Sequence, residues 1–303
     1  MAPEQMPVVH ITEASPLLPV LRSWEIYLQD QGKSIYTIKA FINDLELLAS
    51  FLPPDRNIGS ITTADLNHFL DWLQSGRGVP CSPKSLARRV TSIKAFFRWL
   101  HQGGRLVTDP AEKVVQRSVI SPVPEVLTPD EQERALKAAV IHRHDKKPDA
   151  RPYTLLALLL ETGIKKGECL TINLNHIDLE APSGPYLFIR YTSPSNRYKE
   201  RKLPLSANWV ESYQEYVGQN QLAEQLFPWS PRRLEYLLED IGKEAGLSKH
   251  LSFDMCRWTS ALNDWQAGIE QDKIRQKLGV SKIQWREVSM KLRSLADSEM
   301  RTS

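Results

Sequence analysis

The chain has 303 residues, a length that predicts two domains of ~150 residues each. Hydrophobic residues make up 41% and charged residues 25%, a globular composition that excludes a largely disordered chain. The 39 basic and 36 acidic residues give a formal net charge of +3, which is too small to identify a nucleic-acid-binding protein by itself.

The first part of the chain is predicted to be helical almost throughout. Apolar residues recur there in four runs at i+3 and i+4 steps, the spacing of helices that are buried on one side. The runs are Leu18, Leu21, Trp24, Leu28; Ile38, Phe41, Leu45, Leu48, Leu52; Leu66, Phe69, Leu70, Leu73; and Leu86, Val90, Ile93, Phe97, Leu100. Thr62 is the expected cap of the third helix. We expect an N-terminal tail over residues 1–14 and a four-helix domain over 15–112.

The fourth helix carries an unusual charge pattern. Between Cys81 and Arg105 there are six basic residues and no acidic one. At ~100° per residue, four of them gather opposite the apolar run: Lys84, Arg88, Lys94 and Arg98. A solvated face normally mixes charges of both signs, so an all-basic face indicates contacts with phosphate. A merely soluble face is the alternative.

A linker is expected over residues 113–126, within a stretch that holds three prolines and no helical pattern. A capping box at Thr128 and Glu131, with Pro129 at the first helical position, then opens a second domain over 127–303. Helices are predicted there over 128–142, 151–161, 206–218, 230–245, 254–267 and 270–278. Two short strands, over 186–191 and 200–205, predict a hairpin or small sheet.

A second basic cluster lies on the predicted hairpin, where only Glu200 opposes it. Its members are Arg190, Arg197, Lys199, Arg201 and Lys202. Alone it is weak support for DNA binding, since strand edges often carry lysine to block aggregation. Two basic clusters, one in each domain, favour a C-shaped clamp around a duplex.

Several classes of protein are excluded or disfavoured. No apolar run approaches the ~18 residues of a membrane span, and the first 15 residues predict no signal peptide. The three cysteines, Cys81, Cys169 and Cys256, form no CxxC pair, which argues against a disulfide framework and a cysteine-based zinc site. We expect a cytoplasmic, nucleoid-associated protein with no metal, no cofactor, no membrane partner and no small-molecule substrate.

Motifs in both domains carry a family resemblance. They are Thr37–Leu52, Ser82–Leu100 and Asp109-Pro110-Ala111 in the first domain, and TGIKKGECL (162–170), KERKLPL (199–205), DMCRWT (254–259) and LGV (278–280) in the second. In this order, over residues 15–292, they resemble the tyrosine recombinase (phage integrase) family, which includes the bacterial Xer-type resolvases. The resemblance implies a mainly α fold with a small β-sheet: a SAM-like four-helix core-binding domain followed by a mixed α+β catalytic-type domain.

The same resemblance implies a catalytic set of two arginines, a lysine, two histidines and a tyrosine nucleophile. Five of the six positions differ here. Lys165 stands for the first arginine, Asn196 for the lysine, Asp254 for the first histidine, Val280 for the second and Ser289 for the tyrosine, whereas Arg257 is retained.

These differences bear on strand cleavage. A lysine lacks the bidentate fork of an arginine, Asp254 opposes an anionic phosphate, and the Ser289 hydroxyl needs a general base. No tyrosine follows Tyr236. We therefore expect no catalytic residue and no enzyme, but an accessory, architectural or regulatory protein of DNA recombination and integration.

The expected partner is duplex DNA, bound through nine cations: Lys84, Arg88, Lys94, Arg98, Lys165, Arg197, Lys199, Arg201 and Arg257. Arg257 is equally explained as a structural arginine. The segment Met290–Ser303 either docks on a neighbour, which is a second copy or an active recombinase, or folds back on its own core. Two other functions remain open: an active recombinase or phosphodiesterase with rewired residues, and an assembly subunit that no longer binds DNA.

Overall fold

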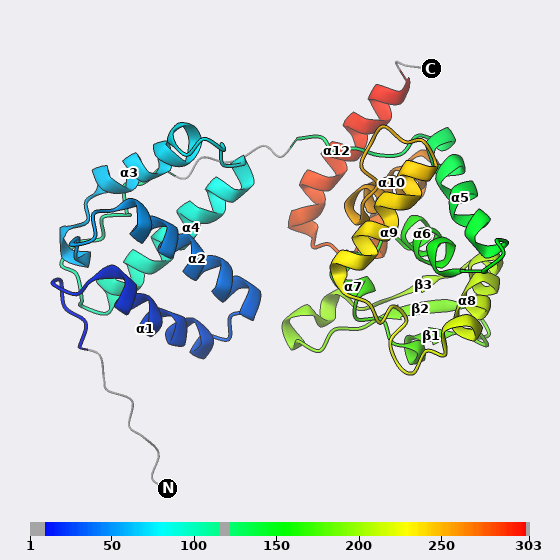
Figure 1. The fold of residues 1–303 in the computed structure, drawn as a ribbon, viewed down its shortest axis with the longest axis horizontal. Coiled ribbons are helices and arrows are strands. Elements are labelled where there is room, and N and C mark those ends of the chain that lie inside the picture. Colours follow the sequence, from blue (N-terminus) through cyan, green and yellow to red (C-terminus); the bar gives the residue numbers. More distant parts are fainter. Residues whose placement is uncertain (1–9, 116–121, 301–303) are drawn as a thin grey trace, which may run out of the picture. The chain divides into compact units, whose positions relative to one another are not determined.

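The computed structural model describes residues 10–115 and 122–300, with the side chains of 299 and 300 left out (Figure 1). Parts of the expected tail (1–9) and linker (116–121) lie outside the described residues, as do residues 301–303. The chain divides into two compact units, Met1–Pro122 and Val123–Ser303. In the described ranges, no helix is both long and apolar enough to cross a membrane.

The first unit is built from four α-helices: α1 (Leu17–Asp30), α2 (Ile35–Phe51), α3 (Thr63–Asp71) and α4 (Pro83–Gln102). Its core contains Trp24, Leu45 and Phe97, all fully buried, so the predicted apolar runs do face inward. The Thr62 side chain accepts the Asp65 N–H in a capping box, which confirms the expected start of α3. Leu18 was wrongly placed in the core, since it is 56% exposed.

A buried carboxylate joins α2 to α4. Asp44 accepts a hydrogen bond from the Ser92 hydroxyl at 2.7 Å. It also forms ion pairs with Arg88 at 3.0 Å and Arg89 at 3.3 Å. Burial raises the pKa of Asp44, although Ser92 and the two arginines act against that shift. Two cations of α4 are therefore engaged within the unit.

The second unit is mainly helical around α6, whose residues are buried on nearly every side. Its helices are α5 (Pro129–Arg143), α6 (Arg151–Thr162), α7 (Lys166–Cys169), α8 (Ala207–Asn220), α9 (Pro231–Glu244), α10 (Phe253–Gln266), α11 (Gln271–Lys277) and α12 (Lys282–Met300). The six predicted helices are confirmed, with small differences at their ends. Helices α7 and α12 were not predicted.

One antiparallel sheet of three strands completes the second unit, in the order β1 (Ile177–Asp178), β2 (Tyr186–Ile189) and β3 (Arg201–Pro204). Leu187 pairs with Leu203, and both are buried in the core. The next pair, Phe188 and Lys202, faces the opposite side, because side chains alternate along a strand. The predicted fold class, mainly α with a small sheet, is confirmed.

Helix α12 packs against α10 of its own unit (Figure 1). Leu292 is fully buried and Leu295 nearly so, in a cluster with Leu262 of α10 and Leu278. Of the two arrangements left open for the C-terminal segment, the described part adopts the one that covers its own core.

Candidate nucleic-acid interface

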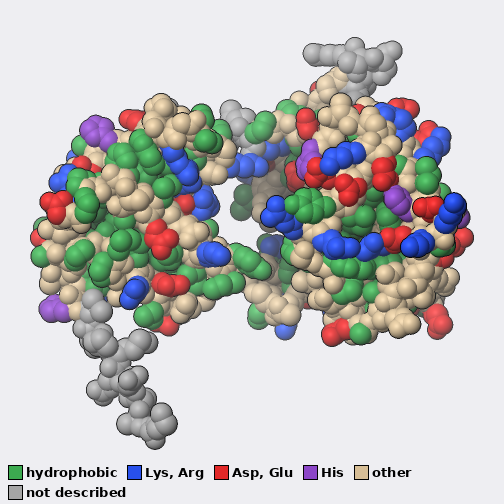
Figure 2. All heavy atoms as spheres, viewed as in Figure 1, with side chains coloured by type: hydrophobic (Ala, Val, Ile, Leu, Met, Phe, Trp, Pro, Cys, Tyr) green, Lys and Arg blue, Asp and Glu red, His purple; other side chains and the backbone are tan. Residues whose placement is uncertain are grey.

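On the face of the molecule that Figure 2 shows, charges of both signs are mixed. Figure 2 shows Lys and Arg side chains interspersed with Asp and Glu on the visible face. The second unit has two cavities that are lined by both cations and acids and that share one residue, Lys165.

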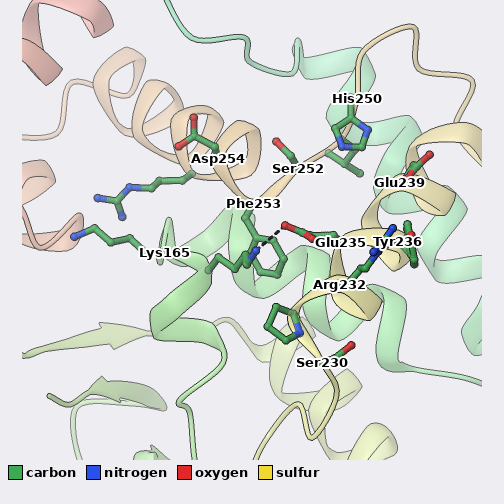
Figure 3. Close-up of a pocket in the computed structure, with 14 residues that line it drawn as sticks. Lys165, Ser230, Arg232, Glu235, Tyr236, Glu239, His250, Ser252, Phe253 and Asp254 are labelled. Atoms are coloured by element: carbon green, nitrogen blue, oxygen red, sulfur yellow. Dashed lines mark hydrogen bonds and ion pairs between the residues drawn. The ribbon is translucent and has the colours of Figure 1, made fainter. Parts of the chain in front are cut away.

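The larger cavity has a volume of about 1060 Å³ and lies between α9 and the start of α10. Figure 3 shows Lys165 and Asp254 at one end of it, and Tyr236, Glu239 and His250 at the other. Arg257 lines the same cavity. The second cavity, of about 890 Å³, extends from Lys165 over the sheet and the β2–β3 loop.

Lys165 is held at the shared wall by the turn between α6 and α7. Gly163 ends α6 in the left-handed conformation (φ 59°), which a glycine adopts without strain. The Lys165 N–H donates to Glu168 at 2.8 Å, and its ammonium reaches only the Gly279 carbonyl, at 3.4 Å. Burial and the charge of Arg257 lower the pKa of Lys165 to about 8. Within the described chain no carboxylate forms an ion pair with this ammonium, although the charge of Glu168 acts to raise its pKa.

Arg257 joins two helix ends beside Lys165. Its guanidinium donates to the Gly163 carbonyl at the end of α6, and to the Leu278 carbonyl at the end of α11 at 2.7 Å. Burial lowers the pKa of Arg257 to about 10. Since Arg257 both makes structural bonds and lines the cavity, the two explanations given for it are compatible.

A buried ion pair lies behind Lys165. Glu168 accepts two hydrogen bonds from Arg201, at 3.0 and 2.9 Å, and a third from the Tyr191 hydroxyl. Burial would raise the pKa of Glu168, but the bonds and charge of Arg201 hold it at about 2. The Arg201 side chain is only 8% exposed and also donates to the Lys277 carbonyl. The expectation that Arg201 contacts DNA therefore needs correction, because its donors are committed inside the unit.

The β2–β3 loop places an ammonium at Asn196. Residues 194–199 form a 3₁₀ helix, in which side chains three residues apart eclipse each other. Lys199 therefore lies directly over Asn196 and donates to its side-chain oxygen at 2.7 Å. The charge of Lys199 contributes to the lowered pKa of Lys165, and both residues line the second cavity. Arg197 on the same loop is exposed.

The remaining family positions are spread out. Asp254 is exposed on the first turn of α10 and lines the larger cavity. Val280 is half-buried against the α10–α12 cluster. The Ser289 hydroxyl donates to the Arg286 carbonyl of its own helix, at 3.2 Å. Neither Val280 nor Ser289 lines one of the two cavities as far as the structure describes them.

Sequence reasoning missed the wall that α9 contributes. Arg232 donates to the Tyr236 hydroxyl at 2.7 Å, and both side chains line the larger cavity. The available signal was an arginine and a tyrosine at i and i+4 on the exposed face of a predicted helix. His250 lines this cavity as well.

The basic face of α4 is only partly free. Lys84 and Arg98 are exposed and form no ion pair among the described residues. Arg88 is paired with Asp44, although its side chain keeps 39% exposure. The Lys94 ammonium donates to the Glu112 carbonyl at 3.2 Å. The four cations are thus not equivalent.

Comparisons with known proteins agree with the division of the chain into two units. Residues 125–287 match the model of the phage integrase family, and residues 21–104 match the phage integrase N-terminal SAM-like domain. Tyrosine recombinase XerC of Roseiflexus castenholzii is 28% identical over 271 residues, which cover 84% of this chain and 82% of the relative. Tyrosine recombinase XerD of Listeria innocua is 23% identical over 276 residues, 84% of this chain and 87% of the relative.

Among solved structures, a lambda integrase tetramer bound to a Holliday junction has the same fold, with a TM-score of 0.71 and 17% identity. The match covers 92% of this chain and 78% of that one. The XerC and XerD relatives carry the names of enzymes, so the expectation that this chain is not an enzyme is contradicted.

Proposed function

Since the chain belongs to the phage integrase family, we propose that it acts in DNA recombination by binding duplex DNA through both of its units. One observation carries the proposal. Lys165, Arg257 and Lys199 surround the wall that the two cavities share, and Lys165 has no acidic partner among the described residues.

A DNA phosphate would supply the negative charge that the Lys165 ammonium lacks at this wall. The nearby acid Glu168 is already neutralised by Arg201, and Asp254 is exposed to solvent. Positive charges that lie close together in a half-buried site repel one another. An anion bound between them offsets this unfavourable electrostatic free energy. Phosphate oxygens accept hydrogen bonds from lysine and arginine, and such contacts supply most of the affinity for DNA of any sequence.

Contacts from the first unit complete the proposal. The exposed cations of α4, Lys84 and Arg98, hold one stretch of backbone, while Lys165 and the loop residue Arg197 hold another. The chain then acts as a two-domain clamp that holds and positions the duplex. Its DNA contacts are mostly to phosphate.

The test is fluorescence anisotropy with a random-sequence duplex. Lys165→Met should weaken binding by about tenfold, the effect of ~1.4 kcal/mol, because it removes the central cation without adding bulk. Lys147→Met is the matched control, since Lys147 is exposed on the α5–α6 loop. Equal affinities for wild type and Lys165→Met, or no binding of duplex at low salt, would overturn the proposal.

Strand cleavage and joining by the chain itself is the second candidate. It is favoured by the three cations beside the cavity and by the enzyme names of the relatives. The hydroxyl at the position of the family nucleophile, Ser289, would have to leave its bond to the Arg286 carbonyl. Denaturing electrophoresis with labelled, nicked DNA tests this candidate. A covalent adduct that disappears in Ser289→Ala would identify Ser289 as the nucleophile. If no adduct and no cleaved strand form, the chain does not cleave DNA and this candidate is wrong.

A further inference from the structure

The outer face of β2 carries a groove, here called the β2 groove. It begins at Lys165 and is lined by His176, Phe188, Arg190, Tyr191 and Arg197. A second hollow, of about 460 Å³, shares His176, Phe188 and Arg190 and continues to Tyr186. The segment from Tyr191 to Tyr186 measures ~16 Å at ~3.3 Å per residue. The groove is thus continuous with the proposed phosphate site and leads away from it.

Aromatic rings and cations are paired along this groove. Tyr186 and Phe188 point away from the core, because Leu187 and Ile189 take the buried positions of β2. The Arg190 guanidinium lies over the Phe188 ring, 5.0 Å from its centre, and the Lys202 ammonium lies 4.1 Å from the centre of the Tyr186 ring. Neither ring belongs to the hydrophobic core.

Stacked rings and guanidinium planes recognise the faces of bases. Bases inside a duplex offer only their edges in the grooves, whereas unpaired bases offer their faces to aromatic rings and arginine planes. A guanidinium fixed on Phe188 is such a plane. This arrangement favours an unpaired strand over a duplex as the occupant of the β2 groove.

The two ends of the β2 groove differ in charge. Lys165, Lys199, Arg197 and Arg190 line the end at the phosphate site. Of the acids there, Glu168 is paired with Arg201 and Glu200 accepts the Tyr191 N–H. Two further acids, Asp178 and Glu180, lie at the Tyr186 end. A nucleic-acid strand is therefore attracted at Lys165 and meets repulsion beyond Tyr186.

His176 adds a hydrogen-bond donor to the middle of the groove. Its Nδ1 accepts the Asn173 N–H at 3.3 Å, which places the ring proton on Nε2. Burial and the charge of Arg190 lower the pKa of His176, so the neutral ring persists at pH 7. Nε2 can donate to an acceptor on a base edge.

We propose that the β2 groove binds unpaired nucleotides of the DNA strand whose phosphate lies at Lys165. The inference rests on the proposed binding of DNA and extends it to a substrate that is locally open. Phe188 and Arg190 hold the base faces, His176 donates to a base edge, and Arg197 contacts the backbone.

The test compares a fully paired duplex with the same duplex carrying a short unpaired bubble that contains 2-aminopurine. Phe188→Leu keeps an apolar side chain but removes the ring, and Arg190→Lys keeps the charge but removes the plane. Each should weaken binding of the bubble at least fivefold, the effect of ~1 kcal/mol of stacking, and leave the paired duplex unchanged. Quenching of 2-aminopurine by wild type should be lost in both variants, and Lys147→Gln should match wild type.

The outcomes separate this inference from the proposed function. If the variants bind bubble and duplex with wild-type affinity and wild-type quenching, the β2 groove does not bind unpaired nucleotides. Weakening of both substrates alike would also overturn the inference, because it would make Phe188 and Arg190 general phosphate or structural residues. If wild type binds the bubble but no paired duplex, the proposed clamp fails and the groove stands.

Discussion

Lys165 connects stability with binding through one buried charge. Its side chain is half-buried, and burial together with the charges of Arg257 and Lys199 lowers its pKa to about 8, from an ordinary value of 10.5. At pH 7 the protonated Lys165 side chain is therefore less stable in the folded protein than in the unfolded chain, and this difference lowers the free energy of unfolding. A binding site kept at a cost to the free protein is common where ligand charge later compensates.

At ~1.36 kcal/mol per pKa unit, the fall from 10.5 to about 8 corresponds to ~3.4 kcal/mol. Because solvent screens this half-buried charge, Lys165→Met should stabilise the free protein at pH 7 by about 2 kcal/mol. The advantage should shrink as the pH rises from about 8 toward 10.5, since wild type then sheds this proton in the folded state. Urea denaturation at pH 7 and pH 9.5 measures both effects. A destabilised variant at pH 7 would show that the aliphatic stem of Lys165 matters more than its charge.

The same group predicts how DNA binding depends on pH. Below about pH 8 Lys165 is protonated in the free protein, so affinity for a duplex should be flat there. Above it affinity should fall, because binding must first restore the proton. Lys165→Arg should remove the fall, since an arginine stays charged. Anisotropy titrations between pH 7 and pH 9.5 test this, and parallel curves for the two proteins would contradict it.

The Glu168–Arg201 pair should behave as a structural element. Arg201→Met leaves the Glu168 carboxylate buried without its partner, which should cost about 3–5 kcal/mol of unfolding free energy. The exposed neighbour Lys202 provides the control: Lys202→Met should cost less than ~0.5 kcal/mol. Urea denaturation of both variants decides the point. If both variants lose a similar, small amount of unfolding free energy, Arg201 is not a structural residue and is again a candidate DNA contact.

Sequence analysis placed Arg201 and Arg88 among the free cations for a physical reason. A charge pattern shows which residue types share a helix or hairpin face, but not the partner that a fold brings from elsewhere. Glu168 is 33 positions from Arg201, and Asp44 precedes Arg88 on a different helix. Lys84 and Arg98, by contrast, are exposed as their positions on α4 predicted.

At the scale of helices, α4 combines support and binding on one face. Arg88→Gln should destabilise the first unit by about 1–2 kcal/mol, because the buried Asp44 loses a charged hydrogen-bond donor. Arg98→Gln should leave stability unchanged and weaken DNA binding. Thermal denaturation and anisotropy on the same pair of variants distinguish the two roles. If Arg98→Gln also unfolds the unit, α4 is not divided in this way.

Helix α12 is held by apolar packing. Leu292 is fully buried in the cluster that α12 forms with α10. Leu292→Ala should therefore lower the free energy of unfolding by about 3 kcal/mol, because the smaller side chain leaves a cavity. Ile283 on the same helix is 80% exposed, and Ile283→Ala should change stability little. Similar losses in the two variants would mean that α12 is not anchored as described.

Helices and strands with a clear period were predictable, and the shortest ones were not. Strong i+3 and i+4 runs predicted α2, α4 and α6 closely. Helix α7 has four residues and β1 has two, too few to show any period. The cavity walls were only partly predictable, because α9 and the β2–β3 loop meet Lys165 through turns that no local pattern encodes.

At the scale of the whole molecule, two separately folded units each present cations to solvent. The first offers Lys84 and Arg98, and the second Lys165 and Arg197. Each unit has its own hydrophobic core, which the sequence predicted from its two kinds of pattern on either side of a proline-rich stretch. A clamp requires that both sets of cations contribute to binding one duplex.

The most direct measurement is the salt dependence of duplex binding, between ~50 and ~200 mM salt, for wild type and two variants. Lys84→Gln with Arg98→Gln neutralises the first unit, and Lys165→Gln with Arg197→Gln the second. We predict that affinity falls linearly with the logarithm of salt concentration, and that each pair flattens the slope by up to ~0.9 per lost phosphate contact. No binding by wild type at low salt, or slopes unchanged in both variants, would contradict the account.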